Sequence, residues 1–152
     1  MRFSGLALVA TIATLSACGG GGDQASQNAT PAASASVVAM PATGKTVELK
    51  MVGDEKGYRF EPREVTINVG DAVTFQTVSG PPHNVAFTNV PAESRAQLQA
   101  NMPEAMGDLM GKMMVGMTDA YTVSFAGVGP GRYEFNCTPH LVNNMTGVIT
   151  VR

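Results

Sequence analysis

One loop near the C-terminus carries three side chains that bind metal ions, and it reads Cys137-Thr138-Pro139-His140-Leu141-Val142-Asn143-Asn144-Met145. The spacing is Cys-x2-His-x4-Met, so a thiolate, an imidazole and a thioether share one short loop. A soft sulfur ligand, a nitrogen ligand and a weak axial thioether are the donors of a mononuclear blue-copper centre. The sequence therefore predicts one type 1 copper ion bound at this loop.

A centre of this kind needs a second imidazole, and the chain contains only one other histidine, His83, in the sequence Pro-His-Asn-Val. Taken alone, each candidate has an ordinary structural explanation, because a buried cysteine usually packs as a small apolar side chain. A lone histidine or methionine is likewise most often part of the core or the surface. Together the four residues provide one complete donor set, so we predict His83, Cys137, His140 and Met145 as the metal ligands.

From Thr46 onward the chain alternates apolar and polar residues in short runs. These runs are centred on Val47–Met51, Val65–Val69, Val73–Thr77, Val85–Phe87, Tyr121–Phe125 and Tyr133–Cys137. Glycine, proline, asparagine and aspartate separate them, which is typical of strands joined by turns. Several short strands of this kind indicate a two-sheet sandwich or barrel, and we expect seven or eight strands.

Four segments of the chain resemble the plastocyanin and pseudoazurin group of cupredoxins, which are small blue-copper electron carriers. They are residues 69–75 (VGDAVTF), 82–87 (PHNVAF), 133–140 (YEFNCTPH) and 145–151 (MTGVITV). The resemblance covers roughly residues 45–152 and implies an all-β Greek-key sandwich. It also implies that Asn84 is bonded to the loop beside Cys137, at Thr138, where it orients the ligands.

By the same resemblance, the ring edge of His140 lies near the surface inside an uncharged rim formed by residues 80–82 and Leu141. Such a rim lets a redox partner come close to the copper. The chain departs from plant plastocyanins at two points. Asn136 stands where those proteins have a tyrosine used as a remote electron entry point, and no acidic cluster follows Phe87. Their second docking site is therefore not expected here.

A methionine-rich insert interrupts the strands at about residues 92–117. Helix-forming residues open it, and five methionines then recur at spacings of four, four, three and four, which places them on one face of a helix. They are Met102, Met106, Met110, Met113 and Met117. Pro103 and three glycines weaken this prediction. The stripe could pack on the sandwich, dock a partner or hold a second copper as Cu(I).

The N-terminus predicts export and lipidation. Arg2 precedes a short apolar run at residues 6–15, and Leu-Ser-Ala-Cys at residues 15–18 resembles a bacterial lipobox. We predict a signal peptide at residues 1–17, a lipidated Cys18 followed by a flexible tether to residue 44, and a copper-binding domain at residues 45–152. The tether lacks large apolar side chains. The alternative is an ordinary secreted protein cleaved nearby.

The composition excludes several functions. The net charge of −2 gives no basic surface for nucleic acid. Two histidines are too few for a multicopper oxidase or a copper nitrite reductase, so we expect no enzymatic activity. We expect a monomeric, membrane-anchored electron carrier, periplasmic or on the cell surface, that serves redox proteins of a respiratory or photosynthetic chain. The alternatives are a periplasmic copper carrier that uses the insert and a purely structural lipoprotein.

Overall fold

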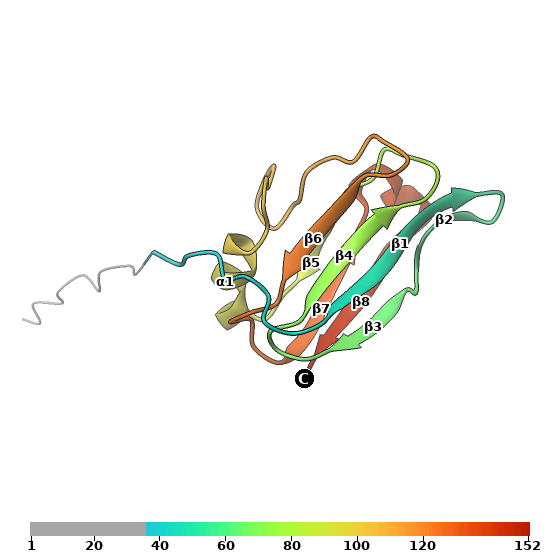
Figure 1. Ribbon diagram of the computed structural model, residues 1–152. Helices are drawn as coiled ribbons and strands as arrows, with labels where there is room; N and C mark the ends of the chain where they lie inside the picture. Colours follow the sequence, from blue (N-terminus) through green and yellow to red (C-terminus); the bar gives the residue numbers. More distant parts are fainter. Residues whose placement is uncertain (1–35) are drawn as a thin grey trace, which may run out of the picture. The chain divides into compact units, whose positions relative to one another are not determined.

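The computed structural model describes residues 36–152, which form two packed β-sheets with one short α-helix at their side (Figure 1). The predicted signal peptide, Cys18 and residues 19–35 of the predicted tether lie outside the described residues. Within residues 36–152, no helix has the length and apolar character needed to cross a membrane.

The first sheet has the strand order β2-β1-β4-β6. Its strands are β1 (Thr46–Asp54), β2 (Gly57–Glu61), β4 (Ala72–Thr77) and β6 (Ala120–Ser124). β1 pairs antiparallel with β2 as a hairpin and parallel with β4, while β4 pairs antiparallel with β6. The hairpin carries Tyr58 opposite Gly53, near one end of the sandwich.

The second sheet has the strand order β3-β8-β7-β5. Its strands are β3 (Glu64–Ile67), β5 (Ala86–Asn89), β7 (Gly131–Asn136) and β8 (Thr146–Val151). β3 runs parallel to β8, whereas β7 pairs antiparallel with both β5 and β8. The loop with the predicted ligands joins β7 to β8 and contains a short 3-10 helix, η2 (Thr138–Asn143).

The inward side chains of both sheets meet in an aromatic core. Phe135 of β7 makes edge-to-face contacts with Phe60, Phe75 and Phe87, with ring centroids 4.8, 5.3 and 5.9 Å away. All four rings are at most 5% exposed. Edge-to-face packing is a preferred aromatic geometry, and burial of these rings stabilises the sandwich. The predicted all-β, two-sheet fold of seven or eight strands is confirmed, with eight strands in residues 36–152.

The insert has only a small helical part, and the prediction of a methionine-bearing helix face is wrong. Helix is confined to η1 (Ala92–Ser94) and α1 (Arg95–Ala100). Residues 109–114 instead run antiparallel to residues 83–87, with hydrogen bonds from Phe87 N to Leu109 O and from Gly111 N to Val85 O, both 2.9 Å. Pro103 and the glycines disfavour continued helix, and this pairing satisfies the backbone instead.

The methionines of the insert consequently have different environments. Met102 is buried and Met110 and Met113 are partly buried, while Met106 and Met117 are exposed. The fully buried methionine of this segment is Met114, which lies outside the predicted set. The methionines therefore do not form one continuous stripe.

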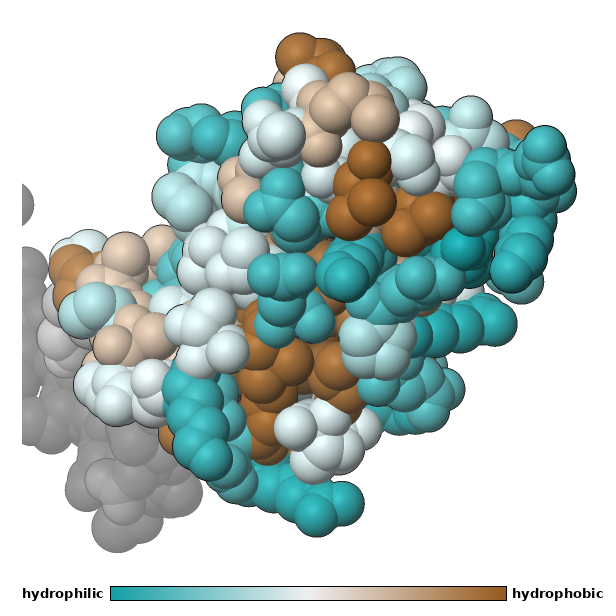
Figure 2. Space-filling model, turned by 45° about the vertical axis from the view of Figure 1, so that its right-hand side comes forward, coloured by the Kyte–Doolittle hydropathy of each residue, from teal (hydrophilic) through white to brown (hydrophobic). Residues whose placement is uncertain are grey.

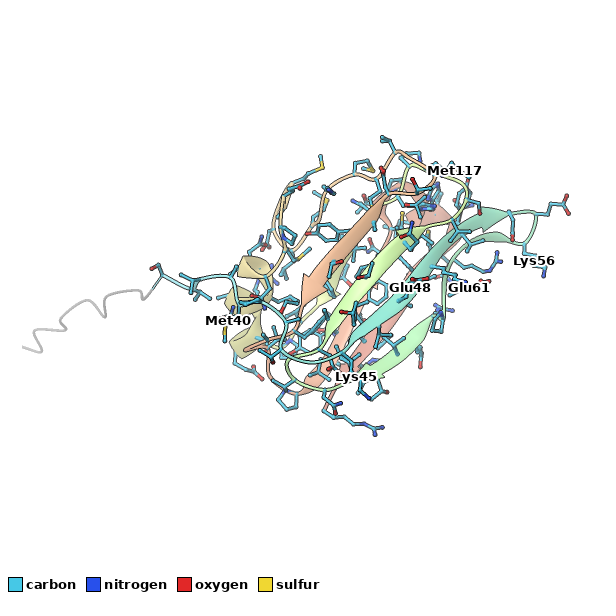
Figure 3. All side chains as sticks on the ribbon, viewed as in Figure 1. Met40, Lys45, Glu48, Lys56, Glu61 and Met117 are labelled. Carbon is cyan, nitrogen blue, oxygen red and sulfur yellow. The ribbon has the colours of Figure 1, made fainter. Side chains whose placement is uncertain are left out.

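The segment before β1 is hydrogen-bonded to the domain through residues 38, 40 and 44. Met40 N donates to Asn101 Oδ1 at 2.8 Å, and Gln97 Nε2 donates to Val38 O at 2.9 Å. Gly44 N donates to Gly70 O at 2.9 Å. Figure 3 shows Met40 beside α1. Small and polar residues do not prevent ordering where backbone groups find partners.

Candidate metal centre

Three of the predicted ligands, His83, Cys137 and His140, form one buried cluster. One ligand atom from each lies within 4.8 Å of the others. The Sγ atom of Cys137 is 3.5 Å from His83 Nδ1 and 3.5 Å from His140 Nδ1. His83 and Cys137 are fully buried, and His140 is 8% exposed. The two imidazoles therefore present the same ring nitrogen to one thiol.

Two loops and the end of a strand bring these residues together. Cys137 follows β7 directly, and His140 lies in η2. His83 lies between β4 and β5, where it exchanges two backbone hydrogen bonds with Met114, of 2.9 and 2.8 Å. Met145 is fully buried just before β8, and its carbonyl accepts a hydrogen bond from Cys137 N at 3.0 Å. The backbone thus places Met145 beside the cysteine.

The hydrogen bonding of His83 fixes its tautomer. Its Nε2 lies 2.9 Å from the carbonyl oxygen of Ser79, which can only accept a hydrogen bond. Nε2 therefore carries the proton, and Nδ1, which faces Cys137, has a free lone pair. A carbonyl that orients a histidine through its other nitrogen is a common support for a metal ligand.

Burial keeps the cluster uncharged when no metal is bound. It raises the pKa of the Cys137 thiol and lowers the pKa of His83. Burial, and then the neighbouring His83, lower the pKa of His140. At neutral pH the site thus holds a thiol and two neutral imidazoles. A bound metal ion must displace the thiol proton, so metal affinity rises with pH.

Asn84 connects the two loops of the cluster. Its Nδ2 donates to Thr138 Oγ1 at 2.8 Å, and its Oδ1 accepts a hydrogen bond from Thr138 N at 2.8 Å. Asn84 is almost fully buried. The bond that the family resemblance implies is present, and it holds the residue next to His83 against the residue next to Cys137.

Tyr58 also belongs to this site, although no sequence pattern points to it. Its ring is stacked on the ring of His140, with centroids 3.6 Å apart and an angle of 10° between the planes. It is far from the ligands in sequence and reaches them only because the β1–β2 hairpin folds over η2. The predicted strands did not include β2, and its sequence contains no signal for this contact.

The donor set fits copper. One thiolate, two imidazoles and a thioether combine soft and borderline ligands, which suit copper better than the hard cations that prefer oxygen. The cluster contains no carboxylate. The cluster is buried, so bulk water is excluded from it. Exclusion of water helps a site to keep the same ligands in two oxidation states.

The surface around His140 is apolar and uncharged. Its exposed apolar residues are Val78, Val115, Met117, Leu141 and Val142. They lie on three loops, residues 78–82, 114–118 and 138–144, which contain no lysine, arginine, aspartate or glutamate. The residues that flank two of these loops are bonded to each other, because the carbonyl of Asp119 accepts a hydrogen bond from Thr77 N at 2.8 Å. Figure 1 places the three loops at one end of the sandwich, where Figure 3 labels Met117.

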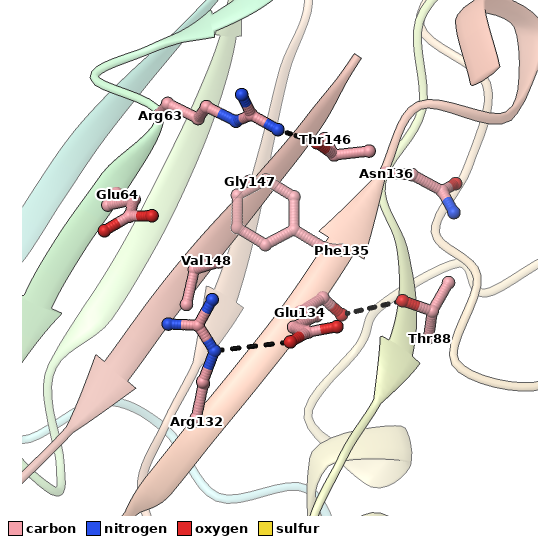
Figure 4. Close-up of a pocket in the computed structure, with 10 residues that line it drawn as sticks. All are labelled: Arg63, Glu64, Thr88, Arg132, Glu134, Phe135, Asn136, Thr146, Gly147 and Val148. Atoms are coloured by element: carbon pink, nitrogen blue, oxygen red, sulfur yellow. Dashed lines mark hydrogen bonds and ion pairs between the residues drawn. The ribbon is translucent and has the colours of Figure 1, made fainter. Parts of the chain in front are cut away.

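A separate polar hollow of about 330 Å³ lies on the second sheet, over β7 and β8 (Figure 4). Its lining includes Arg63, Glu64, Arg132 and Glu134, but none of the clustered ligands. The guanidinium of Arg132 is paired with Glu134 at 3.2 Å, and Arg63 donates to Thr146 Oγ1 at 2.6 Å. On the face shown in Figure 2, hydrophilic residues surround separate hydrophobic patches. Both guanidinium groups of the hollow thus already have partners.

Comparison with known proteins agrees with this geometry. The family of copper binding proteins described as the plastocyanin/azurin family matches residues 47–152. Plastocyanin of Prochlorothrix hollandica is 36% identical over 113 residues, which cover 74% of this chain and 78% of that protein. Plastocyanin of Nostoc punctiforme is 32% identical over 112 residues, or 73% of this chain and 77% of that protein.

A solved structure of the oxidised plastocyanin from Dryopteris crassirhizoma is similar in fold. Its TM-score is 0.54 with 30% sequence identity, over 70% of this chain and 100% of the other.

Proposed function

Because this chain belongs to the plastocyanin/azurin family of copper-binding proteins, we propose that it is an electron carrier whose single copper ion is bound by His83, Cys137, His140 and Met145. The observation that carries this proposal is the convergence of one thiol and two imidazole Nδ1 atoms in a buried cluster. Met145, buried and bonded through its carbonyl to Cys137 N, would supply the thioether of the donor set.

Copper supplies a one-electron couple between Cu(I) and Cu(II). The protein holds the ligands in place for both states. His83 is fixed through its backbone and its Nε2, and Cys137 is bonded through its backbone to Met145. Ligands that do not move need little rearrangement during electron exchange, which keeps the barrier low.

Electrons are exchanged with redox proteins of a respiratory or photosynthetic chain at the apolar end of the sandwich. Support comes from the position of His140, which lies beside Leu141 and the uncharged loops around it. A neutral surface allows close approach of a partner without burying unpaired charge. The relatives named plastocyanin are consistent with this role.

The protein is held at a membrane by lipid on Cys18, on the periplasmic or cell-surface side, after removal of residues 1–17. This part of the proposal is supported by the sequence alone. The apolar run and the Leu-Ser-Ala-Cys motif resemble a lipoprotein signal.

Absorption spectroscopy of the copper-loaded protein tests the copper centre directly. We expect the oxidised protein to be intensely blue, because charge transfer from the Cys137 thiolate gives that band. Cys137→Ser should lose the band entirely, since a hydroxyl does not replace the thiolate. Thr138→Ser, which keeps a hydroxyl that can accept from Asn84, is the matched control and should stay blue. A colourless wild type at full copper occupancy would contradict the proposed function.

A further inference from the structure

Tyr58 contacts both histidines of the metal centre. Its ring is stacked on His140, as described above, and lies edge-on to His83 with ring centroids 6.2 Å apart and an interplanar angle of 68°. Tyr58 is itself only partly exposed, and its ring covers one face of the His140 imidazole and contacts the His83 imidazole. One side chain from β2 thus contacts two ligands that come from other parts of the fold.

Two glycines make room for this ring. A Cβ atom on Gly53, the cross-strand partner of Tyr58, would lie 2.5 Å from the phenol ring. A Cβ atom on Gly80 would lie 2.9 Å from the same ring, and Gly80 also has a positive φ of 70°. Gly53 N donates to Ser79 O, the carbonyl that orients His83. The slot for Tyr58 and the support of His83 are therefore built by the same backbone.

The stacking geometry differs from that of the other aromatic contacts. Among the described residues, the remaining aromatic pairs are all edge-to-face. Neutral rings prefer edge-to-face or offset arrangements, because the negative faces of two parallel rings repel each other. A ring that carries positive charge is instead attracted to the face of a tyrosine. An imidazole bonded to a metal cation is such a ring, so the stack is suited to the loaded site.

We propose that Tyr58 is a positioning residue of the copper centre, which fixes the orientation of His140 and stabilises the oxidised state more than the reduced state. The inference rests on the proposed function, since it requires copper bound by His140. The attraction between the phenol face and the imidazole grows with the positive charge on the ligand. That charge is larger in the Cu(II) state, so removing the ring should raise the midpoint potential.

Voltammetry on the copper-loaded full chain separates this role from simple packing. Tyr58→Leu keeps an apolar side chain but removes the π face, and we expect a higher midpoint potential and a shifted absorption band. Tyr58→Phe keeps the stack and should restore both values. If Tyr58 only fills space, Tyr58→Leu loses stability, but both variants keep the wild-type potential and spectrum. Equal potentials for wild type and Tyr58→Leu would overturn the inference.

Two further measurements decide the question if Tyr58→Leu does not fold. Gly53→Ala displaces the ring while retaining it, and we expect the same upward shift of potential; an unchanged potential counts against the proposal. In the reduced wild type, the ring protons of His140 should appear at higher field than those of His83, because they lie over the phenol face. A missing upfield shift would overturn the stack itself. A wild type that is not blue refutes the proposed function instead.

Discussion

His83 is held in place from three directions, each by a different part of the chain. Its backbone exchanges two hydrogen bonds with Met114, its Nε2 donates to the carbonyl of Ser79, and the neighbouring Asn84 is bonded to Thr138. A ligand held in this way keeps one tautomer and one orientation. The centre therefore depends on residues that never touch the metal, and such partners usually affect metal affinity strongly.

The cluster of His83, Cys137 and His140 could be predicted from the sequence because histidine and cysteine are rare in this chain. The chain has two histidines, and one of them shares a loop with a cysteine and a methionine. Few other copper sites can be built from these residues. Tyr58 and Ser79 could not be predicted in the same way. A tyrosine in an alternating strand has no distinctive pattern, and Ser79 acts through its carbonyl, which every residue has. Their roles appear only when the hairpin and the loops are folded together.

Asp71 makes the stability of the fold depend on pH. Its carboxylate accepts hydrogen bonds from Lys45 N at 2.7 Å and Asn68 N at 2.8 Å, and the bonds from Asn68 and then Lys45 lower the pKa of Asp71 below its usual value. A carboxyl with a lowered pKa stabilises the folded state above its unfolded pKa of about 3.9. That stabilisation is lost as the pH falls from there through the folded pKa.

We therefore expect Asp71→Asn to unfold at a lower denaturant concentration than wild type at pH 7. The difference should shrink as the pH falls below about 4, where the carboxyl of the unfolded chain becomes protonated, and vanish below the lowered pKa of the folded state. Denaturant titrations at a series of pH values measure both effects. Glu48→Gln, at an exposed position of β1, is the control and should follow the wild-type curve. A constant difference at all pH values would show that the charge of Asp71 is not the cause.

At the scale of elements, the insert behaves as an irregular edge strand. Residues 109–114 pair with residues 83–87, the segment that carries His83 and leads into β5. The spacing of the methionines predicted a helix because that periodicity was the strongest local signal. It was overridden by glycines that allow close backbone approach and by hydrogen-bond partners far away in sequence. Element type in such a segment is decided by tertiary pairing.

Gly111 tests whether the insert supports the metal centre. A Cβ atom at this position would lie 2.4 Å from the ring of Tyr121, so Gly111→Ala should push the segment away from Val85 and loosen His83. We expect a loss of about 1–3 kcal/mol in the free energy of unfolding, as for other overpacked sites, and faster loss of copper to a chelator. Denaturant titration and chelator kinetics measure these effects.

Gly107→Ala is the matched control within the insert. Its Cβ atom would meet only the side chain of Met110, the nearest atom being the terminal methyl at 3.0 Å, and that side chain can move aside. We expect its stability and copper release to remain close to wild type. If both variants release copper equally fast, the pairing of Gly111 with Val85 does not stabilise the site.

At the scale of the whole molecule, the chain enters and leaves the domain away from the metal centre. Met40 lies beside α1, and the C-terminal strand ends at the opposite end of the sandwich from η2 (Figure 1). The hydrogen bonds to Asn101 and Gly70 hold residues 40–44 on the domain. The order of these residues could not be predicted from composition, because their partners come from the insert and from a turn far along the chain.

The proposed anchor predicts that the native protein fractionates with membranes. Cys18→Ala should move it to the soluble fraction or leave the signal peptide uncleaved, because no thiol remains to receive lipid. Metabolic labelling with a fatty acid, followed by fractionation, measures both outcomes. Thr30→Ala, further along the predicted tether, is the control and should remain labelled. Recovery of soluble, unlabelled wild type with a free N-terminus would exclude the anchor.

Leu141 tests whether electrons are exchanged at the apolar end of the molecule. It is 53% exposed beside His140, on a loop without charged side chains. When two copies meet through this end to exchange an electron, Leu141→Asp would bring two carboxylates into an apolar contact, and burying unpaired charge is costly. We expect self-exchange to slow by about tenfold or more, since ~1.4 kcal/mol corresponds to a factor of ten. The absorption spectrum should stay unchanged. Line broadening in mixtures of oxidised and reduced protein measures the rate.

Val69→Asp is the control, because Val69 is 46% exposed and is bonded through its backbone to Arg152 at the other end of the sandwich. Equal slowing in both variants would indicate a general effect of charge, and no slowing in Leu141→Asp would place the exchange surface elsewhere.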